Sequence, residues 1–221
     1  RSVSRGLGDV YKRQVIARPF LGDNSGTFFR TKNRKDYTFP PPNKTLCDLV
    51  VENNRSCHAI GKIADIFSHR GISTSVSGLS DDALFYKMID VIKKAKNGDL
   101  IFANFVEFDS LYGHRRDVAG FAAALERFDL KLVKLLEIIN PNDFLIITAD
   151  HGNDPTFKGT DHTREKVPVL MVGNYAQKGN NGNIVFSDVG ATMATFLNLS
   201  GKLKGTNIFN DNNKLEKKCK T

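Results

Sequence analysis

"LIITADHGNDPTFKGTDHTREKVPVLMVG" runs from Leu145 to Gly173 and places two Asp-His pairs between two apolar segments. The pairs are Asp150 with His151 and Asp161 with His162, so two of the five histidines lie in this one stretch. The flanking segments "DFLIITAD" and "VPVLMVG" are short, apolar and rich in β-branched residues, which is typical of buried strands. The stretch therefore predicts polar side chains gathered in the loop between two strands.

A second apolar segment ends in the same way. "LIFANFVEFD" covers residues 100–109 and ends at Asp109, and His114 follows five residues later. Because the carboxyl ends of strands in an open α/β sheet line the ligand crevice, Asp109 and Asp150 are predicted to share one edge. His114, His151 and His162 are then predicted to converge on that edge from the adjoining loops.

The five residues together indicate a metal centre, although any single one is as consistent with a helix cap or an ordinary loop residue. Five mixed oxygen and nitrogen ligands exceed what one tetrahedral site needs. They favour a two-metal site of the kind that clamps a transferring phosphoryl group. Aspartate and histidine without thiolate suit manganese or zinc.

The rest of the chain alternates strands and helices. Helices are predicted over residues 45–54, from Thr45 as N-cap, and over residues 80–98, from Ser80 to Gly98. Further helices are predicted over residues 118–140 and 186–199, and strands over residues 56–63, 100–108, 143–150 and 167–173. This order predicts an α/β fold whose mostly parallel sheet is buried by helices on both faces.

The prolines at positions 40–42 are the strongest break in the chain, and we expect a domain boundary there. Residues 15–42 read as strand and loop, and residues 43–221 as the α/β part. Residues 1–14, "RSVSRGLGDVYKRQ", are unlike their surroundings and read as a non-native N-terminal segment, so they are excluded from the fold prediction.

The composition and charge of the chain indicate which classes of partner it binds. The formal net charge is +8, but much of the basic excess lies near the two ends, and no interior basic stripe is interleaved with aromatics. We therefore predict no nucleic-acid partner and favour a small anionic substrate. No apolar run approaches the roughly 18 residues of a membrane span, so no membrane association is predicted. The three cysteines suggest neither a disulfide framework nor a zinc knuckle, and a cytoplasmic location is expected.

Two motifs resemble phosphopentomutase, a family of the alkaline phosphatase superfamily: "NFVEFDSLYGHRRD" and "ITADHGNDPTFKGTDHTREKVP". "VIARPF", "RTKNRKDY" and "IGKIADIF" resemble segments of that family in the same order. Cofactor-independent phosphoglycerate mutase has similar metal motifs, but it usually reads closer to "TADHGNAE" and lacks "FDSLYGHRRD". Another two-metal phosphotransferase or hydrolase of the superfamily, and a non-enzymatic basic binding module, remain as alternatives.

The resemblance implies an isomerase that interconverts ribose 1-phosphate and ribose 5-phosphate, and the deoxyribose equivalents. The reaction would pass through a phosphothreonine enzyme and a 1,5-bisphosphate, with two Mn²⁺ ions, or Zn²⁺ or Mg²⁺ in their place. By motif position, one metal would be held by Asp109, His114 and His162, the other by Asp150 and His151, and the substrate phosphate by Arg30 and Lys62. Asp161 would orient the loop of His162, whereas Arg115 and Arg116 receive no role.

The chain departs from the family in one respect. Family members are nearly twice as long, and neither their nucleophilic threonine nor a further ligand aspartate is recognisable in these 221 residues. The resemblance thus implies a fragment: residues 15–42 as the end of an α+β cap domain and residues 43–221 as the C-terminal part of the alkaline-phosphatase-like core. The chain as given is predicted to be inactive.

Overall fold

The computed structural model describes residues 14–17, 19–31 and 35–209. The segment predicted to be non-native therefore lies almost wholly outside the described residues. None of the helices in the described part is long and apolar enough to span a membrane.

A parallel sheet forms the centre of the core. Its order is β6 (Thr74–Val76), β5 (Cys57–Ile60) and β7 (Leu100–Ala103), with β5 in the middle and both pairings parallel. Alternate residues of these strands face opposite sides of the sheet, and both sides are apolar. Cys57 and Leu100 belong to one buried cluster, whereas Ile60 belongs to another.

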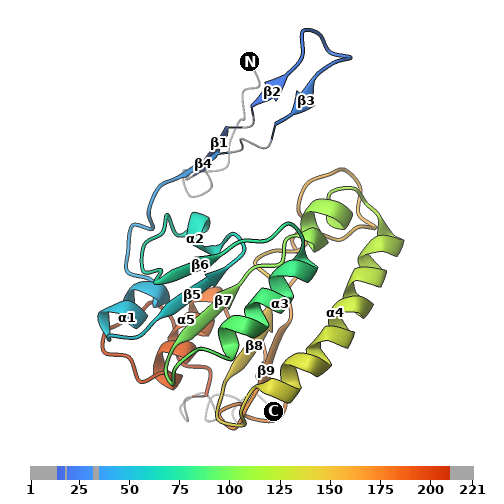
Figure 1. The fold of residues 1–221 in the computed structure, drawn as a ribbon. Coiled ribbons are helices and arrows are strands. Elements are labelled where there is room, and N and C mark those ends of the chain that lie inside the picture. Colours follow the sequence, from blue (N-terminus) through green and yellow to red (C-terminus); the bar gives the residue numbers. More distant parts are fainter. Residues whose placement is uncertain (1–13, 18, 32–34, 210–221) are drawn as a thin grey trace.

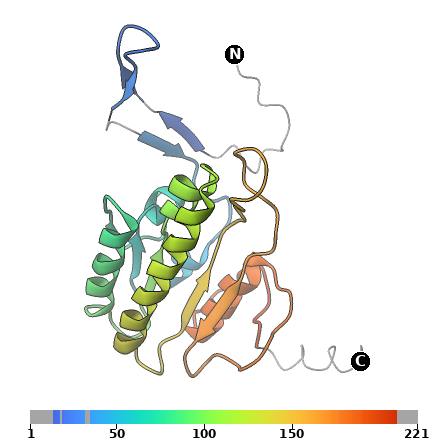
Figure 2. The ribbon, with the colours of Figure 1, turned by 90° about the vertical axis from the view of Figure 1, so that its right-hand side faces the viewer.

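Helices cover both faces, as Figures 1 and 2 show. On one face α1 (Leu46–Glu52) and α5 (Phe186–Phe196) pack against the cluster that contains Cys57. On the other face α3 (Asp81–Ile92) and α4 (Val118–Ile138) enclose a cluster that contains Phe85 and Leu135. A short helix, α2 (Ile63–Ile66), follows β5. The predicted α/β core is confirmed.

The helix starts follow from local capping. Thr45 and Asp48 form a capping box at the start of α1, and the hydroxyl of Ser80 accepts a hydrogen bond from the Ala83 N–H at the start of α3. Both predicted N-caps are confirmed. The helix after Ser80 ends at Ile92 rather than near Gly98, and turns at residues 93–94 and 97–98 follow it.

The strand pair β8 (Leu145–Thr148) and β9 (Val169–Val172) is antiparallel and forms a separate sheet. A parallel return needs a crossover connection, usually a helix, and residues 149–168 contain no helix. The connecting loop instead rises to one end of the core and returns, as the orange trace in Figure 2 shows.

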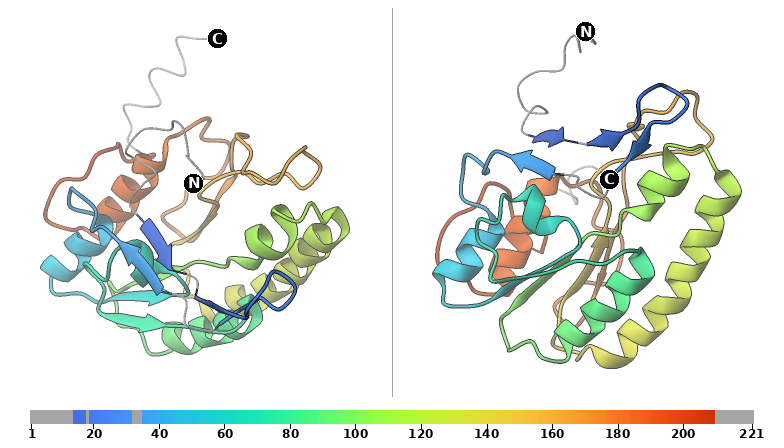
Figure 3. Two further views of the ribbon diagram at one scale, coloured as in Figure 1. Left: turned by 90° about the horizontal axis from the view of Figure 1, so that it is seen from above. Right: turned by 45° about the horizontal axis from the view of Figure 1, so that its top comes forward.

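The N-terminal strands pair only with one another within the described residues. β1 (Gln14–Ala17) pairs with β4 (Lys35–Thr38), and β2 (Phe20–Leu21) with β3 (Phe29–Arg30), all antiparallel. They project from the core (Figures 1 and 3), and the Thr38 hydroxyl anchors them by donating to the Asp65 carbonyl at 2.7 Å. This arrangement supports a separate unit before the prolines, and the domain bounds stay a prediction.

Candidate metal centre

A π-helix presents two of the candidate ligands. Strand β7 ends at Ala103, so the expectation that the strand runs on to Asp109 is wrong, and Asp109 lies in the π-helix η2 (Phe108–Gly113). The His114 N–H donates to the Asp109 carbonyl at 3.0 Å, the five-residue spacing of a π-turn. This spacing places the two side chains together, with 3.3 Å between His114 Nε2 and Asp109 Oδ2.

A side chain at the start of α3 holds the start of η2. The Asp81 carboxylate accepts the N–H groups of Val106 at 3.0 Å and Glu107 at 2.8 Å. Burial raises the pKa of Asp81, and these two backbone hydrogen bonds oppose that shift. The strand stops early because residues 106–107 donate to Asp81 rather than to a neighbouring strand.

The loop between β8 and β9 supplies the other candidates. Asp150 and His151 follow β8 directly, and a β-bridge between Gly152 and Thr163 returns the loop beside them. The Glu165 carboxylate lies over Gly152, where a Cβ atom would meet it at 2.3 Å, so this side chain would have to move to admit any other residue. Because of the bridge, the rings of His151 and His162 stack with centroids 3.7 Å apart.

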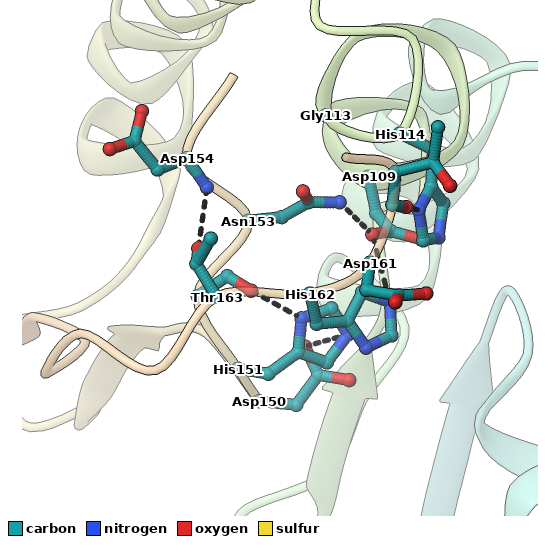
Figure 4. A network of polar contacts seen from close by, with 12 residues as sticks. Asp109, Gly113, His114, Asp150, His151, Asn153, Asp154, Asp161, His162 and Thr163 are labelled. Carbon is teal, nitrogen blue, oxygen red and sulfur yellow. Dashed lines mark hydrogen bonds and ion pairs between the residues drawn. The ribbon is translucent and has the colours of Figure 1, made fainter. Parts of the chain in front are cut away.

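Figure 4 shows that all five predicted ligands gather in one cluster. His162 Nε2 lies 3.3 Å from Asp109 Oδ1, and His151 Nε2 lies 3.7 Å from Asp150 Oδ1. The rings of His114 and His162 are 4.8 Å apart between centroids. Asp109, His151 and His162 each offer a ligand atom, and these atoms all lie within 4.8 Å of one another.

The contacts of His114 and the pKa of His162 bear on metal binding. His114 Nδ1 lies 2.5 Å from the Thr160 carbonyl oxygen, which only accepts, so Nδ1 is the donor and Nε2 is the ring nitrogen that faces Asp109. Burial lowers the pKa of His162, and the neighbouring His151 lowers it further, against the opposing effect of Asp109. A neutral imidazole is the form that binds metal. The residues therefore fit one or more divalent ions that prefer oxygen and nitrogen ligands.

The two candidate phosphate ligands lie in different parts of the structure. Arg30 is the last residue of β3 in the projecting strands, with its backbone paired to Phe20, and its side chain is outside the described part. Lys62 follows the carboxyl end of β5 and precedes α2. Since β5 and β7 are parallel, Lys62 lies at the same end of the sheet as the segment that leads into η2. Their roles in substrate binding stay predictions.

The sequence prediction missed the partners of the ligands. The Asn153 amide donates to Asp109 Oδ1 at 2.5 Å, and Arg116 contacts both η2 and the loop of His162. Asp161 contributes its backbone carbonyl, which accepts from Arg116 at 2.6 Å. The one signal in the sequence is proximity to the motifs, because Asn153 follows "DHG" and Arg116 follows "GHR".

Comparisons with known proteins identify the family. The sequence model of the family described as "Metalloenzyme superfamily" matches residues 53–201. The phosphopentomutase of Legionella pneumophila (strain Corby) is 50% identical over 203 residues, which cover 91% of this chain and 50% of that protein. The phosphopentomutase of Rhizobium leguminosarum bv. trifolii (strain WSM2304) is 48% identical over 199 residues, covering 89% and 49%.

The chain thus spans about half the length of these curated relatives, and its predicted resemblance to phosphopentomutase is confirmed. Among solved structures, the PH0037 protein from Pyrococcus horikoshii has a TM-score of 0.58 and 16% identity, covering 76% of this chain and 49% of that chain. This likeness concerns the fold alone. The matched family segment contains all five residues of the cluster, and the chain belongs to the metalloenzyme superfamily.

Proposed function

We propose that this chain is the metal-binding part of a phosphopentomutase, which interconverts ribose 1-phosphate and ribose 5-phosphate and the deoxyribose equivalents. The observation that carries the proposal is the identity of about half the residues to phosphopentomutases over about nine-tenths of the chain. The cluster of aspartates and histidines supports it, because phosphoryl transfer depends on cations that neutralise the charge of the transferring group.

The residues of the cluster would hold two divalent ions, with Mn²⁺ as the proposed metal and Zn²⁺ or Mg²⁺ as the alternatives. Bound cations would polarise the phosphoryl oxygens and stabilise the charge that develops on them. Asp109, His114 and His162 are proposed for one ion and Asp150 and His151 for the other. The tightest group of donor atoms combines Asp109 and His162 with His151, so the two ions would share one compact cluster.

Basic side chains would bind the substrate. We propose that Arg30 and Lys62 contact the phosphate group of the pentose phosphate. For Lys62, its place after the carboxyl end of β5 supports this, because ligands of open α/β sheets bind at that end of the strands. For Arg30, the support is the resemblance of "RTKNRKDY" alone.

The covalent step needs a threonine that we did not recognise in this chain. Thr163, next to His162, is engaged elsewhere: its hydroxyl accepts from the Asp154 N–H at 2.7 Å and donates to Glu165 at 2.8 Å. A nucleophile needs a hydroxyl that is free to be activated and aimed at the phosphoryl group. We therefore propose that these 221 residues alone do not isomerise ribose 1-phosphate.

A mutase assay with Mn²⁺ and a bisphosphate primer tests the proposal. It compares the chain as given with a chimera in which residues from Val15 onward follow the N-terminal half of the Legionella pneumophila relative. We expect turnover by the chimera only, abolished by Asp150→Ala. Turnover by the short chain would contradict its proposed inactivity. A folded, metal-loaded chimera that is inactive on pentose phosphates but converts phosphoglycerate would show that the substrate assignment is wrong.

A further inference from the structure

The guanidinium of Arg116 lies at the junction of the two segments that carry the metal-ligand candidates. It donates five hydrogen bonds, all to oxygens of residues in η2 or in the loop between β8 and β9. The acceptors are the carbonyls of Gly113 (3.1 Å), Asp154 (2.8 Å), Gly159 (2.5 Å) and Asp161 (2.6 Å), and the side-chain oxygen of Asn153 (2.7 Å).

Nη1 makes three of these contacts with its two hydrogens, so one hydrogen is shared between two acceptors, and Nε and Nη2 make one contact each. A guanidinium presents five N–H donors in a rigid planar fork, whereas a lysine ammonium is a compact group with three. Arg116 also has a φ of 54°, in the left-handed region that non-glycine residues rarely occupy. Such a backbone conformation persists only where the surrounding contacts hold it. Arg116 thus links η2 to the loop between β8 and β9 through direct hydrogen bonds, unlike a cation that only faces solvent.

Asn153 connects Arg116 to the ligand candidate Asp109. Its side-chain oxygen accepts from Arg116, and its amide donates to Asp109 Oδ1 at 2.5 Å (Figure 4). The approach is close: a Cβ atom on Gly113 would lie 2.4 Å from the Asn153 amide nitrogen. The amide therefore orients the Asp109 carboxylate against the end of η2.

Two further ligand candidates depend on the same loop. His114 Nδ1 is bonded to the Thr160 carbonyl, and the residues on either side of Thr160 are both held by Arg116. His162 directly follows Asp161, whose carbonyl is one of those acceptors. Three of the five candidates, on two segments, are thus linked to one guanidinium.

We propose that Arg116 and Asn153 are positioning residues for the metal centre: Arg116 fastens the loop to η2, and Asn153 aims the Asp109 carboxylate. The inference rests on the metal site of the proposed function. Partners behind metal ligands set ligand orientation, and losing one typically weakens metal binding by roughly 10- to 100-fold. A purely structural role would lower stability and leave the affinity of the folded protein unchanged.

The test is Mn²⁺ titration by calorimetry on the 221-residue chain, with circular dichroism to verify folding. Arg116→Gln and Arg116→Lys are compared with the matched control Arg115→Gln. Arg115 is exposed, and no hydrogen bond or ion pair joins its side chain to the described residues. We expect both Arg116 variants to bind Mn²⁺ roughly 10- to 100-fold more weakly than the unaltered chain, because Lys keeps the charge but not the fork. The control should match the unaltered chain.

Asn153→Leu keeps the inference testable if the Arg116 variants do not fold. It keeps the four carbonyl contacts of Arg116 and removes the side-chain contacts of Asn153 to Arg116 and to Asp109, and we expect the same order of loss in Mn²⁺ affinity. Folded variants of both residues with the affinity of the unaltered chain would overturn the inference and leave the proposed function standing. An unaltered chain that is folded and binds no Mn²⁺, Zn²⁺ or Mg²⁺ would overturn the proposed metal site itself.

Discussion

Asp48→Asn should destabilise the chain strongly and in a pH-dependent manner. The Asp48 carboxylate closes the capping box of α1 by accepting from the Thr45 N–H at 2.7 Å and the Thr45 hydroxyl at 2.8 Å. It also accepts from Arg70 Nε at 3.0 Å and Nη2 at 2.9 Å. The same guanidinium donates to the carbonyls of Pro41 and Asn43. Asp48 therefore ties the proline segment to the core.

The expected cost is about 2–3 kcal/mol. Removing one partner of a buried ion pair costs about 3–5 kcal/mol, and a hydrogen bond to a charged group contributes about 1.5–3 kcal/mol. The Asp48 side chain is 11% exposed, which favours the upper figures, but Arg70 is 34% exposed and can regain water. Asparagine also keeps one acceptor oxygen. These two features place the estimate at the lower end.

The pH dependence follows from the pKa of Asp48. Burial opposes its charged form, but the hydrogen bonds from Arg70 and Thr45 outweigh burial and lower the pKa below its ordinary value. A carboxylate with a lowered folded-state pKa contributes stability that is fully present above about pH 4, the unfolded value, and is lost as the pH falls through the folded value. The difference between the unaltered chain and Asp48→Asn should hold near neutral pH and shrink below about pH 4.

Urea unfolding followed by circular dichroism at pH 7 and pH 3 measures this difference. Asp90→Asn serves as the control, because Asp90 is exposed in α3, and its effect should stay within about 0.5 kcal/mol. An Asp48→Asn loss no larger than that of the control would refute the reasoning from buried contacts. A loss of equal size at both pH values would refute the assignment of a charged Asp48.

Three further results are expected. His162→Ala should weaken Mn²⁺ binding by more than about 100-fold, beyond the usual effect of a supporting partner. His69→Ala, which removes a histidine with a 69% exposed side chain, should leave Mn²⁺ binding unchanged. Equal Mn²⁺ affinities of the two variants in calorimetry would contradict the ligand role of His162. Thr192→Val should lower the free energy of unfolding in urea by about 1–3 kcal/mol, because the fully buried hydroxyl accepts the Ile208 N–H at 2.9 Å and valine leaves that donor unpaired. An unchanged free energy of unfolding would show that water or another acceptor replaces the Thr192 hydroxyl. Chelation of divalent ions should lower the thermal midpoint of the metal-loaded chain, since a ligand of the folded state stabilises it; an unchanged midpoint would contradict metal binding by the folded chain.

Much of the fold could be predicted from the sequence because its signals are local. Thr45 and Ser80 cap the next turn of chain, and apolar spacing marks α3 and α4 over a few turns each. Asp150 and His151 likewise follow a strand closely in the sequence, and Asp161 and His162 repeat the pair in the same loop, so the sequence indicates these side chains of the candidate site. Capping and periodicity act over a few residues, which is why a linear sequence displays them.

The remaining features depend on contacts between distant segments, and only the tertiary structure decided them. β9 runs antiparallel to β8 because the loop returns directly through the bridge at Gly152. The strand before Asp109 stops early because Asp81, 25 and 26 residues away, takes the N–H groups of Val106 and Glu107. Arg116 reaches acceptors as far as 45 residues along the chain. Hydrogen-bond donors and acceptors are common to most residues, so their pairing is set by which segments the packed core brings together.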